Sequence, residues 1–168
     1  MNGKIVVLAL VFVVCGAGAW WLFSGSETDE ERIKALFGKM AESCAKKSKE
    51  SSIVMAMKNS DFSNFVANPC SVTIGEALVD GTFSPMEFAA QLTKGRVMFK
   101  SIYGELGDWN IKVASDGKSA VVEYSVRIRG ETKQGGKFDE SRDLRSELLK
   151  IDEKWKISSF EIKQVLEK

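Results

Sequence analysis

The sequence contains no histidine among its 168 residues. Histidine is the side chain most often used for proton transfer near neutral pH and is also the commonest metal ligand. Its absence therefore disfavours many enzyme mechanisms. Only three cysteines are present, Cys15, Cys44 and Cys70, and none stands in a C-x-x-C spacing. A zinc site built from thiolates is close to excluded, and we predict no metal and no cofactor.

The chain also lacks an excess of charge of one sign. Its 24 basic and 23 acidic residues give a formal net charge of +1. Without a strong positive field, phosphate backbones are not attracted, so we expect no nucleic-acid partner. After the first two dozen residues, the remaining sequence has the size of one ordinary domain with a single core.

The longest hydrophobic run lies near the N-terminus, where Ile5 to Phe23 reads IVVLALVFVVCGAGAWWLF without a charge. At about 1.5 Å per residue, a helix of this length nearly matches a hydrocarbon core roughly 30 Å thick. Lys4 precedes the run and acidic residues follow it, which places the N-terminus in the cytoplasm. We therefore predict a single-pass membrane protein, with residues 1–25 as the anchor and residues 28–168 as a periplasmic or otherwise extracytoplasmic domain.

Two other interpretations of this run stay open. Ala17-Gly18-Ala19 fits the small-residue pattern of a cleaved signal peptide, although the hydrophobic residues WWLF continue past it. Lipid modification of Cys15 is the third interpretation, but the preceding Phe12-Val13-Val14 lacks the small residue that such processing usually needs. All three interpretations export the domain.

Two helix starts are marked by capping boxes. Thr28-Asp29-Glu30-Glu31 precedes an apolar stripe at helical spacing that ends at Cys44. Ser84-Pro85-Met86-Glu87 combines an N-cap, a proline at the first helical position and a capping glutamate. We expect this second helix to run to about Lys100 and to bury Phe88, Leu92 and Phe99.

The remaining segments predict short helices and then strands. Ile53 to Met57 and Asp61 to Val66 each suit a helical turn or two, and Val72, Ile74 and the Asp80-Gly81 turn suggest a short strand or hairpin. Beyond Lys100 the apolar residues alternate in four runs separated by turns. Helices followed by an antiparallel meander predict an α+β fold in which the helices cover one face of a curved sheet.

This order resembles the nuclear transport factor 2-like (NTF2-like, or SnoaL-like) superfamily over about Thr28 to Leu166. The most recognisable piece is Leu148 to Ile157, LLKIDEKWKI, which is similar to the last hairpin of that superfamily. The resemblance implies a cone-shaped, cystatin-like domain with a pocket between sheet and helices. Because the superfamily includes enzymes, ligand binders and noncatalytic assembly domains, the resemblance alone does not indicate a function.

The enzymatic template of that superfamily is not met here. Its enzymes use a tyrosine-backed oxyanion site with an aspartate base, or a dyad containing histidine. The only tyrosines here are Tyr103 and Tyr124, and neither falls in the first helix. We therefore predict no catalytic residue, although a buried Glu140 could act as a base because desolvation raises a carboxylate pKa.

The alternation of side chains between the two faces of a strand identifies the candidate ligand-binding residues. If the two strands flanking Gly135-Gly136 pair across an odd-numbered loop, Val126 and Leu144 share one face, and Arg145 stays out of the core. That face then carries the polar residues of our predicted ligand site, Tyr124, Glu140, Arg142 and Ser146. Glu140 and Arg142 either reach water where the strand overhangs the core or orient a ligand at a pocket mouth.

We therefore predict a noncatalytic, membrane-anchored envelope domain that binds a small apolar ligand or a protein partner, including a second copy of itself. The alternative is a SnoaL-like enzyme of the isomerase, cyclase or dehydratase type that uses an acidic pocket residue. Cys44 and Cys70 both suit buried positions, so we favour two free thiols over a disulfide between them.

Overall fold

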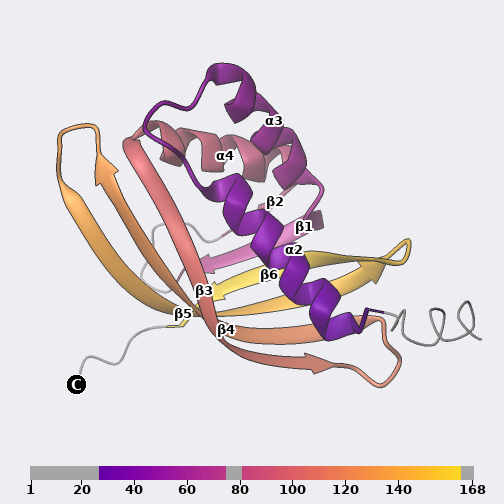
Figure 1. Ribbon diagram of the computed structural model, residues 1–168. Helices are drawn as coiled ribbons and strands as arrows, with labels where there is room; N and C mark the ends of the chain where they lie inside the picture. The colour runs from indigo at the N-terminus through magenta and orange to yellow at the C-terminus, as the bar shows by residue number, and fades with distance from the viewer. Residues whose placement is uncertain (1–26, 75–80, 164–168) are drawn as a thin grey trace, which may run out of the picture.

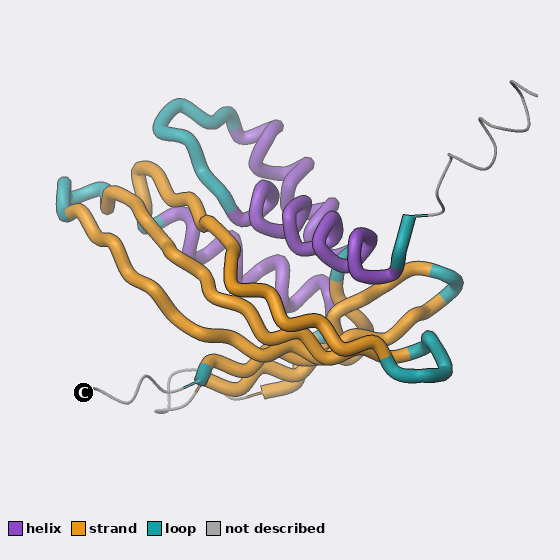
Figure 2. Tube along the Cα trace, turned by 60° about the horizontal axis from the view of Figure 1, so that its bottom comes forward, coloured by secondary structure: helices purple, strands orange, loops and turns teal. Residues whose placement is uncertain are grey.

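The computed structural model describes residues 27–74 and 81–163. Within them, three helices lie against one face of a curved sheet of six strands (Figures 1 and 2). The elements follow in the order α2 (Asp29–Cys44), α3 (Ser52–Ser63), β1 (Val66–Ile74), β2 (Gly81–Phe83), α4 (Pro85–Val97), β3 (Phe99–Val113), β4 (Ser119–Thr132), β5 (Lys137–Ile151) and β6 (Lys154–Ile162).

Both predicted capping boxes are present. The Thr28 hydroxyl accepts from the amide of Glu31, whose carboxylate accepts from the Thr28 amide at 2.8 Å. Ser84 and Glu87 repeat this arrangement at the start of α4. In each helix the capping pair satisfies amides that have no partner inside the helix, so both helices begin where the sequence predicts.

Three expectations about element boundaries were wrong. The segments expected as separate short helices join in one helix, α3, which ends at Ser63, and Val66 belongs to β1 instead. Helix α4 ends at Val97, and Phe99 already begins β3, so Phe99 belongs to a strand. Contacts across the sheet override helix periodicity here, because Phe99 pairs with Thr132 of β4 and its ring packs on that of Phe138 at 5.2 Å between centroids.

The sheet has the strand order β2-β1-β6-β5-β4-β3. Strands β3 to β6 form the predicted antiparallel meander, and β1 and β2 pair as an antiparallel hairpin. Strand β1, however, runs parallel to β6, which corrects the expectation of a wholly antiparallel sheet. The parallel pair follows from connectivity, since helix α4 and four strands, β2 to β5, separate β1 from β6 and allow a long crossover.

The β4–β5 hairpin has the predicted register. Tyr124 pairs with Leu144 and Val126 with Arg142, so residues of even number face the helices together. The Thr132 amide donates to the Gly136 carbonyl at 2.8 Å and closes a three-residue loop in which Gly135 has a φ of 88°. A one-residue slip is unfavourable because it would turn Arg145 and Glu147 toward the core.

The hydrophobic core lies between the sheet and the helices. Helix α2 contributes Ile33 and Phe37, both fully buried, and the sheet contributes Val122, Leu148 and Ile157. Trp155 of β6 also belongs to this core and is 4% exposed. Trp109 packs against this core and stacks on Tyr124 with 5.5 Å between ring centroids.

The predicted anchor, Ile5 to Phe23, lies outside the described residues. Among the helices that the structure does describe, none combines the length and the hydrophobicity that crossing a bilayer requires.

Candidate functional site

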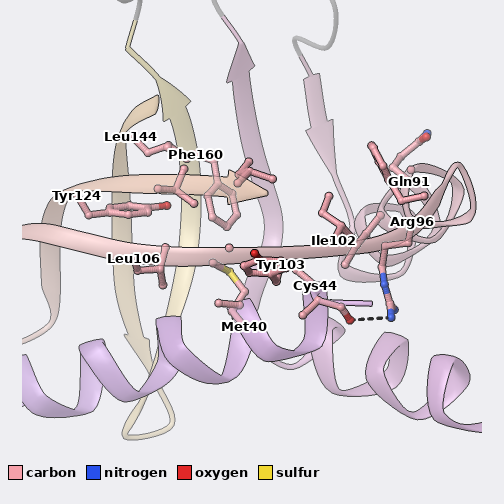
Figure 3. Close-up of a pocket in the computed structure, with 18 residues that line it drawn as sticks. Met40, Cys44, Gln91, Arg96, Ile102, Tyr103, Leu106, Tyr124, Leu144 and Phe160 are labelled. Atoms are coloured by element: carbon pink, nitrogen blue, oxygen red, sulfur yellow. Dashed lines mark hydrogen bonds between the residues drawn. The ribbon is translucent and has the colours of Figure 1, made fainter. Parts of the chain in front are cut away.

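A cavity of about 440 Å³ lies between the sheet and helices α2 and α4 (Figure 3). This volume falls within the range of about 300–1,000 Å³ typical of small-molecule sites. Apolar side chains from six elements form most of its wall, namely Met40 on α2, Leu92 on α4, Ile102 and Leu106 on β3, Val126 and Ile128 on β4, Leu144 on β5 and Phe160 on β6.

Tyr124 supplies a hydroxyl group at the sheet side of the cavity. Tyr124 lies on the strand face that the alternation along β4 and β5 predicts for a pocket. In Figure 3 its hydroxyl points along the sheet toward Phe160. The hydroxyl lies 3.3 Å from that of Ser146, which is fully buried behind it. Burial raises the pKa of Tyr124 to about 12, so the phenol is neutral and serves as a hydrogen-bond donor or acceptor.

Glu140 and Arg142 do not line the cavity. Register places them opposite Ile128 and Val126, which do line it, so the predicted strand face is correct. Their side chains nevertheless extend into solvent, 57% and 45% exposed, and pair with each other at 2.9 Å between Arg142 Nη2 and Glu140 Oε2. Of the four predicted site residues, the structure brings Tyr124 and Ser146 together and leaves this pair outside, where the strand overhangs the core.

Arg96 at the end of α4 lies at the other end of the cavity (Figure 3). Although charged, it is only 2% exposed. Its Nη2 donates to Glu50 Oε2 at 2.5 Å and to the carbonyl of Ala45 at 3.1 Å. Its Nε and Nη1 have no hydrogen-bond partner among the described residues.

Two lysines complete this charged cluster. Lys58 Nζ donates to Glu50 Oε1 at 2.5 Å and to the Ala45 carbonyl at 2.7 Å. Lys46 Nζ donates to the carbonyls of Phe99 and Arg96, at 2.6 and 3.1 Å. Desolvation lowers the pKa of Lys46, and nearby Lys133 and Arg96 lower it further. We call Lys46, Glu50, Lys58 and Arg96 the charge cluster, in which the side chains of Glu50 and Arg96 are buried and the two lysines are partly exposed.

Sequence reasoning missed Arg96, although a signal was present. Arg96 follows Phe88 and Leu92 at intervals of four residues, on the stripe that was expected to be buried. A charged residue in that position implies a buried partner, but the sequence does not show that the partner is Glu50 from the loop before α3.

Cys44 also lines the cavity, and the structure contains no bond between it and Cys70. The preference for two free thiols is therefore confirmed. Burial raises the pKa of Cys44 to about 12 and that of Cys70 to about 11, so both are protonated near neutral pH. Among the described residues, no group of three histidine, cysteine, aspartate or glutamate side chains could hold a metal ion.

No family model and no curated protein sequence matches the chain. Solved structures do match it. A putative scytalone dehydratase from Novosphingobium aromaticivorans superposes with a TM-score of 0.67 at 12% identity, covering 82% of this chain and 85% of the other. A hexachlorocyclohexane dehydrochlorinase, LinA-type3 from Novosphingobium barchaimii, gives 0.61 at 13% identity, covering 80% and 84%.

A protein of unknown function with a cystatin-like fold from Nostoc punctiforme gives a TM-score of 0.58 at 12% identity, covering 80% of this chain and 89% of the other. The chain has the NTF2-like, cystatin-like α+β fold. This is the fold that the sequence resemblance implied. At identities this low the likeness concerns the fold, and the chemistry has to be argued from the cavity itself.

Proposed function

We propose that this domain binds a small, mostly apolar molecule in the cavity between its sheet and its helices, without transforming it. One observation carries the proposal: a cavity of about 440 Å³ has a wall built mainly from aliphatic and aromatic side chains. Empty apolar volume forfeits dispersion contacts, so a ligand that fills it gains them. Tyr124 offers such a ligand one neutral hydroxyl group for orientation.

The protonation states around the cavity favour binding over acid–base chemistry. Among the described residues that line it there is no aspartate and no glutamate. Two of its lining side chains, the Cys44 thiol and the Tyr124 phenol, each have a pKa raised to about 12 by burial. A general base works best with a pKa near the working pH, so neither group is suited to that role. Enzymes such as LinA-type3 share the fold, but neither Cys44 nor Tyr124 offers such a base in this cavity.

The cellular setting is part of the same proposal. Ile5 to Phe23 would hold the domain at a membrane, with residues 28–168 on the extracytoplasmic side, where a protein partner could also meet it. A reporter enzyme fused after Lys168 tests this orientation. Activity of a reporter that functions only in the cytoplasm would contradict it.

Filling the cavity tests the binding site. Gly104 lines the cavity, and a Cβ added there would meet only Val126, at 3.6 Å, so Gly104→Leu places its extra atoms in the empty space. We expect this variant of the full chain to bind the neutral fluorescent probe N-phenyl-1-naphthylamine at least tenfold more weakly than the wild type.

Gly38→Leu is the matched control, because Gly38 is exposed on α2 and a Cβ there meets nothing within 4 Å. The same change outside the cavity should leave probe binding at the wild-type level. Equal binding by the wild type and both variants would place the probe elsewhere and overturn the proposal.

A further inference from the structure

Helix α3 presents its apolar side chains to solvent. Ile53 and Met57 are 72% and 63% exposed, and Val54 beside them is 41% exposed. Its polar side chains Lys58 and Asn59 instead turn toward the domain, where Lys58 is held in the charge cluster and Asn59 Oδ1 is buried. A surface helix usually has the opposite arrangement, with its apolar stripe against the core. The outer face of α3 is therefore suited to contact something apolar.

The end of α4 adds two more exposed apolar side chains at the same end of the domain. Val97 and Met98 are 44% and 67% exposed. The ion pair of Glu50 with Arg96 joins the loop before α3 to the end of α4, and the Lys133 amide in the β4–β5 loop donates to the Met98 carbonyl at 3.3 Å. Figure 1 shows these segments at the upper left, away from the start of α2. Five of the nine exposed large hydrophobic side chains described therefore gather at one end, and a cluster of this kind indicates an interaction site more strongly than single exposed residues do.

Basic residues surround these apolar side chains. Glu50 is buried and already paired with two cations, and Glu131 beside the β4–β5 loop is paired with Lys100. Four exposed lysines at this end form no ion pair with a described residue, namely Lys47 and Lys49 in the loop between α2 and α3, Lys94 in the last turn of α4, and Lys133. We call these four lysines and the five apolar residues Ile53, Val54, Met57, Val97 and Met98 the basic apolar end.

We propose that the basic apolar end binds the surface of a bilayer that contains anionic lipids. At such a surface, apolar side chains enter the headgroup region while lysines beside them contact the anionic headgroups. Ile53, Met57 and Met98 are each largely exposed, so they project outward and do not line a groove, and none of the five apolar side chains lines the cavity. Projecting side chains suit a bilayer, which they can enter singly, better than an extended peptide, which binds in a groove or along a strand edge.

The same charges disfavour a second copy of the chain as the occupant. Two copies that met through this end would bring their unpaired lysines together, and like charges repel each other. An anionic bilayer presents the opposite charge to every one of these lysines. The contact is separate from the cavity and extends the proposed function to a second surface of the domain.

The contact also predicts how the domain lies. Helix α2 has 16 residues and is about 24 Å long, and its start is far from the basic apolar end. If Ile5 to Phe23 holds the start of α2 at the same bilayer, the domain lies along the surface and does not stand upright on it.

Oxidation of methionine by hydrogen peroxide tests the contact without any substitution. Met57 and Met98 belong to the basic apolar end, whereas Met86 is 80% exposed near the start of α4, about 18 Å along that helix from Met98. In the full chain with vesicles of phosphatidylcholine and phosphatidylglycerol in equal parts, Met57 and Met98 should oxidise severalfold more slowly than with phosphatidylcholine alone. Met86 should react at the same rate in both, because it lies outside the contact. Peptide mass spectrometry measures the sulfoxide at each position.

Four outcomes would overturn the proposal. They are equal oxidation of Met57 with the two kinds of vesicle, an equal slowing of Met86, failure of the chain to float with the anionic vesicles, and protection of Met57 and Met98 that needs no anionic lipid and increases with protein concentration. The last result would identify a second copy as the occupant.

Paired variants then test the lysines. Lys47→Gln with Lys49→Gln removes two charges from the basic apolar end, and Lys112→Gln with Lys118→Gln makes the same change at the β3–β4 hairpin, where both lysines are also exposed. We expect the first double variant to lose most of the difference between anionic and neutral vesicles, and the second to keep it. A difference of the same size in both double variants would refute the role of the lysines at the basic apolar end.

Discussion

Arg96 and Glu50 form an ion pair that joins α4 to the loop before α3, with 2.5 Å between Nη2 and Oε2 and both side chains at most 3% exposed. Lys58 contacts the other carboxylate oxygen of Glu50. Such a pair contributes little net stability compared with apolar residues of the same size, but removing one partner leaves a buried charge uncompensated.

We therefore predict that Glu50→Ala destabilises the domain by about 3 kcal/mol, within the range found for broken buried pairs. Glu140→Ala breaks the exposed pair with Arg142 and should cost less than about 1 kcal/mol. Chemical unfolding followed by tryptophan fluorescence measures both values. Similar losses in the two variants would mean that burial does not determine the strength of the Glu50 contacts.

A second prediction concerns Gly130 on β4. A Cβ at this position would lie 2.5 Å from the Ser101 carbonyl oxygen of β3 and 2.8 Å from the ring of Phe138. The Phe138 ring could rotate, but the backbone of β3 can move only by disturbing the ladder. Gly130→Ala should therefore destabilise the domain by about 1–3 kcal/mol, as overpacking does elsewhere.

Gly38→Ala gives the contrasting result for the same chemical change. Gly38 lies within α2, and the space around its Cα is open. Alanine favours a helix interior over glycine by roughly 1 kcal/mol, so this variant should be more stable than the wild type. If Gly130→Ala also stabilises the domain, β3 and β4 do not approach each other as closely at this point as the structure shows.

The sequence predicts those parts of the fold that depend on local chemistry. Thr28 and Ser84 are followed three residues later by glutamate, and both helices begin there. Alternation in β4 and β5 predicts their register, since only one parity keeps Arg145 out of the core. Phe99 shows the limit of this reasoning, because strand pairing with Thr132, far away in the sequence, ends α4 earlier than its helix pattern suggests.

The candidate site was less predictable than the fold, because it too depends on contacts between residues that are far apart in the sequence. Parity places Tyr124, Ser146, Glu140 and Arg142 on one face, but it does not show where the helices stop covering that face. Tyr124 lies under α2 and lines the cavity, whereas Arg142 lies beyond the lining. The partnership of Arg96 with Glu50 spans 46 positions and depends on how α3 and α4 pack, which no local pattern shows.

The third prediction concerns thiol reactivity. Burial raises the pKa of Cys44 to about 12 and that of Cys70 to about 11, so very little thiolate is present at pH 8. In the folded protein, iodoacetamide should modify both residues far more slowly than a free cysteine. Peptide mapping after labelling in urea without reductant should find both fully modified. Two unlabelled thiols and a mass lower by about two hydrogens would indicate a disulfide.

The last prediction uses pH to test the contact between the start of α2 and the β5–β6 hairpin. Asp29 accepts hydrogen bonds from Lys150 Nζ at 2.9 Å and from Trp155 Nε1 at 3.0 Å. The bond from Lys150, followed by that from Trp155, holds the pKa of Asp29 below its ordinary value of 3.8. Because the folded pKa is depressed, this carboxylate contributes stability fully above pH 3.8 and loses it as the pH falls through the folded pKa.

Asp29→Asn should therefore be less stable than the wild type at pH 7, with a difference that stays constant down to about pH 5 and shrinks below pH 3.8. Urea unfolding at a series of pH values measures this difference. In a Lys150→Met background, the same substitution should have a smaller effect at pH 7, because the strongest of the contacts to Asp29 is already absent. A difference that grows on acidification would have the wrong sign for a carboxylate with a lowered pKa. It would mean that Asp29 is not bound to the hairpin in its charged form.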